Sequence, residues 1–96
     1  MSNLSFNGVY RFNANQNLST RKEYAQRDYL MGFFAKFATN GQEEAAKFLK
    51  FDRNVKQGII SPKAPCYLTY NLPEESACQA FEKHMTDVGQ KFEKIG

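Results

Sequence analysis

Hydrophobic and polar residues alternate in two stretches of the chain, and this period of two predicts two β-strands. The first is residues 5–13, where Tyr10 and Phe12 stand between polar neighbours. The second is residues 66–72, where every second position is apolar. In a strand, alternate side chains point to opposite faces of the sheet, so one face of each strand should be buried.

A third stretch, residues 20–40, carries the period of an amphipathic helix. Thr20 and Glu23 have the spacing of a capping box, which predicts the start of the helix at Thr20. Asn40 and Gly41 predict its end, because glycine adopts the left-handed conformation common after a helix. Its broad apolar face should form the main part of the core.

The remaining chain predicts two more helices and one weak strand. A second helix should follow Gly41 and end near Phe51. Residues 57–61 are rich in β-forming side chains and predict a short edge strand. Pro73 predicts the first position of a last helix, whose apolar stripe continues as far as Ile95.

These elements predict an α+β fold. We expect a small single domain spanning residues 1–96, in which an antiparallel or mixed three-stranded sheet packs against two or three helices. The element order is strand, helix, helix, weak strand, strand, helix. The centres of the apolar faces predict a shared, deeply buried cluster of Phe33, Phe37, Leu68 and Phe81.

The composition agrees with an ordinary globular chain. Of its 96 residues 42% are hydrophobic and 24% are charged, which excludes the disordered and fibrous classes. The first residues lack the charged and apolar regions of a secretory signal, and no apolar run is long enough to span a bilayer. We therefore expect a cytoplasmic protein that does not enter a membrane.

No pattern of catalytic or cofactor-binding residues is present in the sequence. Cys66, Cys78 and His84 are the candidates for nucleophilic chemistry, but Cys78 and His84 are six positions apart on a helix and point in different directions. The same three residues are too few for a structural zinc site, which usually has four ligands. The glycines are too scattered for a phosphate-binding loop. We expect neither an enzyme nor a bound cofactor.

Positive charge is concentrated between residues 47 and 63, where five cationic side chains face one acidic residue, Asp52. Such a segment, with Phe48 and Phe51 among the cations, has the character of a phosphate-backbone contact. Cations near the end of a solvated helix are the simpler interpretation. The candidate nucleic-acid-binding residues are Lys47, Lys50, Arg53, Lys56 and Lys63.

A second apolar stripe lies on the first helix, opposite its core face. Tyr24 and Met31 fall within about 40° of each other there, and Arg27 lies beside them. Tyrosine, methionine and arginine are enriched at protein interfaces. Phe92 and Ile95, at the end of the last helix, should protrude beyond a narrow sheet and meet a second chain.

The expected function is therefore non-enzymatic binding of another macromolecule. The preferred partner is a protein, or a second copy of the chain in a homodimer, contacted through Tyr24, Arg27, Met31, Phe92 and Ile95. Such a protein would act as an adaptor, inhibitor or regulator. Nucleic-acid binding through residues 47–63 is the alternative.

Overall fold

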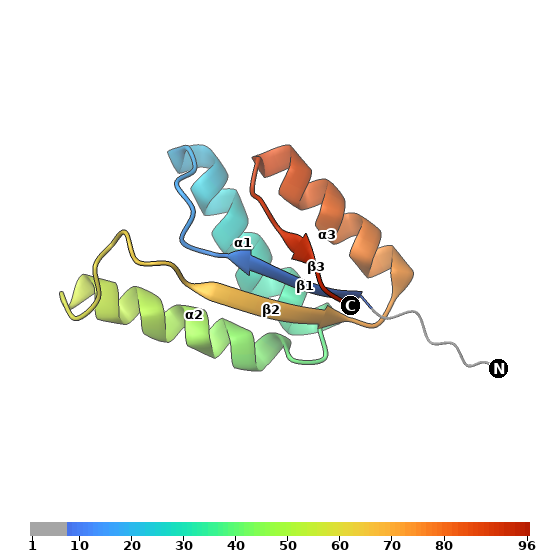
Figure 1. Cartoon of the computed structure of the whole chain (residues 1–96), viewed down its shortest axis with the longest axis horizontal. Helices are drawn as coiled ribbons and strands as arrows, with labels where there is room; N and C mark the ends of the chain where they lie inside the picture. The colour runs from blue at the N-terminus through green and yellow to red at the C-terminus, as the bar shows by residue number, and fades with distance from the viewer. Residues whose placement is uncertain (1–7) are drawn as a thin grey trace.

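The computed structural model of the chain describes residues 8–96, which form three helices and a three-stranded antiparallel sheet (Figure 1). The α+β class predicted from the sequence is confirmed. Residues 5–7 of the first predicted strand lie outside the described part. The elements in chain order are β1 (Gly8–Asn13), α1 (Thr20–Phe37), α2 (Gly41–Lys56), β2 (Tyr67–Leu72), α3 (Glu75–Val88) and β3 (Glu93–Lys94).

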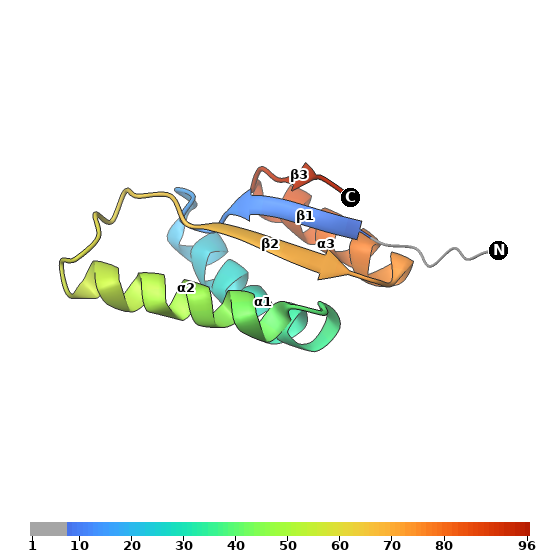
Figure 2. The same cartoon turned by 60° about the horizontal axis from the view of Figure 1, so that its bottom comes forward.

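The strand order in the sheet is β2-β1-β3, so the first strand of the chain lies at the centre (Figure 2). Tyr10 is paired with Tyr70 across β1 and β2, and Arg11 is paired with Glu93 across β1 and β3. Three strands were predicted, but the third is not at residues 57–61. It is formed by residues 93–94, which follow the last helix.

Residues 57–61 form turns instead of a strand because α2 runs past Phe51 to Lys56 and then stops sharply. The Lys56 ammonium lies 3.2 Å from Asp52, one helical turn earlier, and this pair supports the additional turn. Gly58 then has a φ of +77°, a left-handed conformation that ends the helix. Ile59 is therefore left 68% exposed.

The last helix is shorter at both ends than the sequence predicted. It begins at Glu75 and not at Pro73, and it ends at Val88. Gly89 has a φ of +75°, and its N–H donates to the carbonyls of the last turn, which is a left-handed helix cap. The apolar spacing that continues to Ile95 therefore belongs to a returning segment that ends the sheet.

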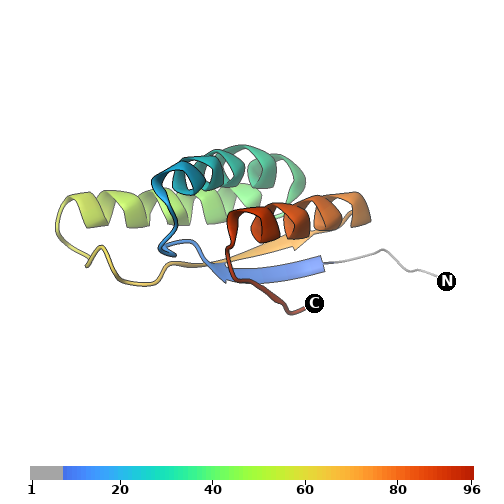
Figure 3. The same cartoon turned by 90° about the horizontal axis from the view of Figure 1, so that it is seen from above.

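All three helices lie on one side of the sheet, and the core fills the space between the two layers (Figure 3). Tyr10 and Phe12 of β1 point into this space, and Phe81 of α3 packs against both rings at centroid distances of 4.5 and 5.9 Å. The other large core residues include Leu30, Phe34, Phe48, Leu68, Tyr70, Leu72 and Met85.

The core prediction is correct for Leu68 and Phe81, which are fully buried, and wrong for the two residues of α1. Phe33 is half-buried and Phe37 is 39% exposed, whereas Phe34 is fully buried and stacks on Tyr70 at 3.9 Å. The aromatic face of α1 is too broad for the sheet to cover all of its rings. The sheet covers Phe34 and leaves Phe33 and Phe37 at the margin of the core.

Both ends of α1 also differ from the prediction. The N-cap is Ser19 rather than Thr20, and its hydroxyl accepts a hydrogen bond from the Lys22 N–H. Gly41 does not have a positive φ and starts α2 instead of capping α1. Glycine is required there because a Cβ would lie 1.8 Å from the Phe34 carbonyl oxygen.

Candidate functional site

The sheet has one face that no helix among residues 8–96 covers (Figure 3). Side chains alternate along each strand, so the neighbours of the core residues point to this side. We call it the open face. Its side chains on β1 and β2 are Val9, Arg11, Asn13, Tyr67, Thr69 and Asn71.

Arg11 is the centre of the open face. Its guanidinium lies 4.1 Å from the centroid of the Tyr67 ring on β2, a cation–π contact. On the other side it lies 3.7 Å from the Glu93 carboxylate on β3, and the two side chains of this ion pair are 41% and 67% exposed. Exposed pairs of this kind contribute little stability, so an incoming anion can replace Glu93 at low cost.

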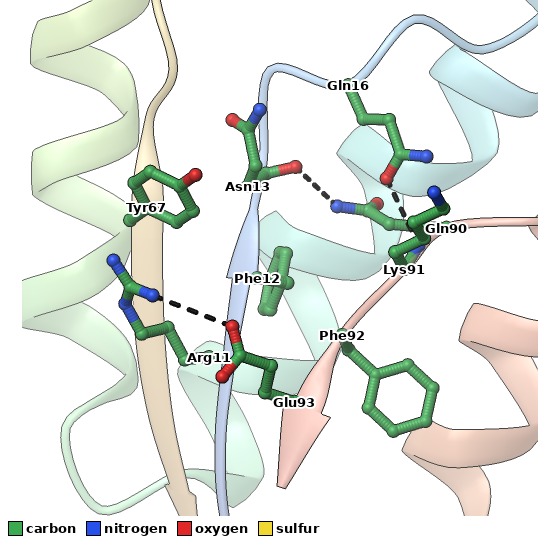
Figure 4. A pocket seen from close by; sticks show the side chains of 9 residues that line it. All are labelled: Arg11, Phe12, Asn13, Gln16, Tyr67, Gln90, Lys91, Phe92 and Glu93. Atoms are coloured by element: carbon green, nitrogen blue, oxygen red, sulfur yellow. Dashed lines mark hydrogen bonds and ion pairs between the residues drawn. The ribbon is translucent and has the colours of Figure 1, made fainter. Parts of the chain in front are cut away.

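A groove adjoins this arginine at the end of the sheet (Figure 4). Its volume is about 760 Å³, which is within the range of pockets that hold small ligands. Phe12 and Phe92 contribute apolar surface, and the polar lining includes Asn13, Gln16 and Lys91. Figure 4 shows Arg11 and Glu93 toward one end of the groove and the side chains of Gln16 and Gln90 toward the other.

Gln90 fixes the position of the segment that forms one wall of the groove. Its side-chain amide donates to the Asn13 carbonyl at 2.6 Å, and its oxygen accepts a hydrogen bond from the Gln26 amide. Gln90 and Gln26 are both buried. A buried, fully paired amide chain holds its members rigidly, so β1 and the returning segment keep a fixed separation.

The amide chain ends at His84 on α3. His84 Nε2 lies 2.5 Å from Gln26 Oε1, and because Gln26 uses its amide N–H elsewhere, Nε2 must donate the proton. The imidazole also stacks on Tyr29, with ring centroids 3.6 Å apart. Burial lowers the pKa of His84 below its usual value, and the nearby Asp87 opposes this effect only in part.

The outer edge of β2 is closed by side chains from the start of α2. Asn40 accepts from the Asn71 N–H through Oδ1 and donates to the Thr69 carbonyl through Nδ2, at 3.0 and 2.7 Å. Glu44 Oε1 accepts from the Thr69 N–H at 2.7 Å, and the Thr39 N–H donates to the Asn71 carbonyl at 2.9 Å. A partner strand therefore cannot pair with this part of the edge.

The outer surface of the helical layer is a second candidate. Tyr24 is 68% exposed and Met31 is 41% exposed, as the stripe on α1 predicted. Arg27 beside them donates to Asp52 of α2 at 2.9 Å and lies 5.3 Å from the centroid of the Phe48 ring. This arginine is therefore a structural link between the helices as well as part of the surface.

Leu49 of α2 belongs to the same surface and was missed from the sequence. It is 48% exposed and lies one turn before Asp52, while Met31 lies one turn after Arg27 on the antiparallel α1. Because Arg27 and Asp52 are paired, Met31 and Leu49 stand at the same height along the two helix axes. We call the surface formed by Tyr24, Met31 and Leu49 the helical seam.

Phe92 and Ile95 lie away from the helical seam. Phe92 packs edge-on against Tyr10 and Phe81, with centroids 5.9 and 5.3 Å away, and is half-buried. Ile95 is exposed, and its N–H donates to the Val9 carbonyl at 2.7 Å. The prediction that both protrude from the end of a helix is wrong, because the helix has already stopped at Val88.

The basic segment does not form one continuous stripe. Its four cations on α2 are three residues apart, so each lies about 60° further round the helix than the last. Lys47 pairs with Glu44 and Lys56 pairs with Asp52, both at 3.2 Å. Lys50, Arg53 and Lys63 are exposed.

The candidate nucleophiles are separate and buried. Cys66 and Cys78 are free thiols, and burial raises the pKa of Cys66. The Cys78 thiol donates to the Leu72 carbonyl, whereas His84 is engaged with Gln26 and Tyr29. No group of three or more metal-ligating side chains occurs among the described residues.

The chain matches no protein-family model, no curated protein and no solved structure. Within residues 8–96, none of the helices is both long enough and apolar enough to cross a bilayer.

Proposed function

We propose that the chain is a non-enzymatic protein-binding module, and that its partner docks on the helical seam. The observation that carries this proposal is the exposure of Tyr24, Met31 and Leu49 on one surface across two helices. Tyrosine supplies a large contact area at low entropic cost, methionine adapts its flexible side chain to the partner, and both are enriched at interfaces.

The ion pair between Arg27 and Asp52 adds specificity to this surface. It is partly buried in the free chain, and hydrogen bonding to Arg27 lowers the pKa of the Asp52 carboxyl. A docked partner would exclude more water from the pair and strengthen its hydrogen bond. A partner that buried an unpaired charge directly against this pair would be disfavoured, because Arg27 and Asp52 already neutralise each other.

Nucleic-acid binding by the basic segment receives less support from the geometry. Two of its five cations are paired with carboxylates, and the cations on α2 spread around half of the helix. Uninterrupted rows of cations follow a phosphate backbone better than such a spread. The helical seam is the better-defined surface.

The proposal is tested by affinity purification from the native cell with immobilised protein. Nuclease treatment of the extract removes indirect links through nucleic acid. The double variant Tyr24→Asp, Met31→Asp should lose the partner that the unmodified chain retains, because a buried charge opposes docking. Ile59→Asp is the matched control, since Ile59 is as exposed as Tyr24 but lies in the turn after α2.

The same variants identify the kind of partner. If a second copy is the partner, sedimentation of the purified chain will show a dimer that the double variant converts to a folded monomer. If a different protein is the partner, the chain will sediment as a monomer and the recovered protein will bind in purified form. Equal recovery of every bound protein by the double variant and by Ile59→Asp would contradict the proposal.

A further inference from the structure

We infer that the open face and its groove bind single-stranded nucleic acid, with a base on Tyr67 and phosphates at Arg11 and Lys91. This site is separate from the helical seam and does not depend on it. The inference rests on an exposed aromatic ring, two cations and a polar groove that meet on the one uncovered face of the sheet.

The aromatic ring is the first observation. Tyr67 is 47% exposed although the Arg11 guanidinium already stacks against it. A tyrosine on an uncovered strand presents a π-face on which any base can stack, and arginine adds a cation–π contribution. The pair Tyr67 and Arg11 thus forms a platform for one base.

The groove gives the next nucleotide a place. It begins beside Arg11 and extends along the returning segment to Lys91 and Gln16 (Figure 4). Lys91 is exposed, and its backbone N–H donates to Gln16 Oε1 at 3.1 Å, which holds the Gln16 side chain at the wall of the groove. Amide side chains suit the edges of bases, which carry both donors and acceptors.

The charge of the site favours a phosphate ligand. Arg11 and Lys91 provide two positive charges, and the single acid of the lining, Glu93, is held by Arg11 across an exposed 3.7 Å contact. A phosphate oxygen can take the place of that carboxylate and form a bidentate contact with the guanidinium. The neighbouring hollow, which shares Gln16 with the groove, carries one cation and one acid, Lys63 and Glu23, and so leaves this balance of charge unchanged.

A protein ligand fits this face less well. The edge of β2 is closed by Asn40 and Glu44, so a peptide cannot extend the sheet there. The open face between the strands is largely polar and lacks a buried apolar pocket for an anchor residue. The bases of a duplex are paired and stacked on one another and cannot stack on Tyr67, so the expected ligand is single-stranded.

The test is fluorescence anisotropy with labelled ten-nucleotide oligouridine and oligothymidine at low salt. We expect saturable binding that weakens as salt is raised, because each neutralised phosphate releases counterions. Tyr67→Leu should lower the affinity about tenfold, which is the usual loss on removing one stacking platform. Lys91→Gln should lower it and also reduce its salt dependence.

Two matched variants serve as controls. Phe37→Leu removes a partly exposed aromatic ring from α1, and Lys36→Gln removes an exposed positive charge from the same helix, so neither should change the affinity. No binding at low salt would overturn the inference, as would an unchanged affinity in Tyr67→Leu. Equal losses in Lys91→Gln and Lys36→Gln would show attraction by net charge alone and would also overturn it.

A labelled polyglutamate peptide separates nucleic acid from acidic protein. If it binds the open face as tightly as the oligonucleotides, the site recognises negative charge and the inference is wrong. Thermal unfolding of each variant verifies that the fold is retained, which the exposure of Tyr67 and Lys91 leads us to expect.

Discussion

Phe34 is a central residue of the core, because it stacks on Tyr70 and also contacts Phe12 and Phe81. Replacing it with alanine removes all of these contacts and leaves a cavity between α1 and the sheet. Phe34→Ala should therefore lower the free energy of unfolding by about 3–5 kcal/mol. Urea denaturation followed by circular dichroism measures the change.

Phe37→Ala is the matched control at the same helix. Phe37 is 39% exposed and contacts mainly Phe33, so its loss should cost only about 1–2 kcal/mol. A larger cost for Phe37 than for Phe34 would show that α1 is rotated about its axis relative to the arrangement described above.

His84 predicts how stability depends on pH. Its folded pKa is lowered by burial, so below about pH 6.5 the unfolded chain binds the proton more readily than the folded chain. The free energy of unfolding should therefore fall as the pH is lowered from about 7 toward the folded pKa, and it should be constant above that range.

His84→Gln keeps a side-chain donor for Gln26 but has no proton to gain. In this variant the loss of stability between about pH 7 and 5 should be absent or much smaller. Asp52 and Tyr29 do not mimic the effect, because hydrogen bonding to Arg27 lowers the pKa of Asp52 and burial raises the pKa of Tyr29, so both move away from this range. Urea denaturation at several pH values makes the comparison.

At the scale of the elements, the α1–α2 hairpin contains two glycines, and a side chain should be tolerated at one of them and not at the other. Gly32 lies in the middle of α1 with open space around it, so Gly32→Ala should stabilise the chain by about 0.5–1 kcal/mol through helix propensity. Gly41 touches the backbone of α1 at Phe34, so Gly41→Ala should cost about 4 kcal/mol or more. Thermal unfolding of the two variants measures both effects.

An unchanged melting temperature in Gly41→Ala would contradict the close approach of the two helices. The two variants thus test how closely α1 and α2 approach at the turn, where a Cβ on residue 41 would lie 1.8 Å from the Phe34 carbonyl oxygen.

The elements with a strong local signal were predictable from the sequence. The spacing of apolar residues directly predicts strand β2 and the buried face of α3 that contains Phe81. The end of α3 was missed because Phe92 and Ile95 continue the helical spacing past Val88 and obscure the stop signal of Gly89. The second helix was predicted, but its extension from Phe51 to Lys56 was missed because Asp52 and Lys56 form their contacts only once the helix exists.

The open face was predictable only in part. Alternation places Arg11 and Tyr67 opposite the core once Phe12 and Leu68 are known to be buried. The absence of a covering helix depends on where all three helices pack, and no local pattern encodes that choice. The groove depends further on a long-range hydrogen bond from Gln90 to Asn13, which no spacing in the sequence indicates.

At the scale of the whole molecule, the two candidate surfaces lie on different layers. The helical seam belongs to α1 and α2, and the open face belongs to the sheet (Figure 3). A ligand on one surface leaves the other free. If both proposals hold, the chain can hold a protein and a single-stranded nucleic acid at the same time, and excess partner protein should not displace the oligonucleotide.

The central position of β1 in the sheet has a consequence for the order of events during synthesis. β1 is made first, but its two neighbours, residues 67–72 and 93–94, come from the far end of the chain. At about 5–20 residues per second, β1 waits several seconds on the ribosome before β2 emerges. The α1–α2 hairpin has local contacts and can form in that interval, so it precedes the sheet. The nascent chain thus carries an unpaired strand beside a finished helical hairpin, and it is exposed to chaperones and to aggregation until residue 72 has left the exit tunnel.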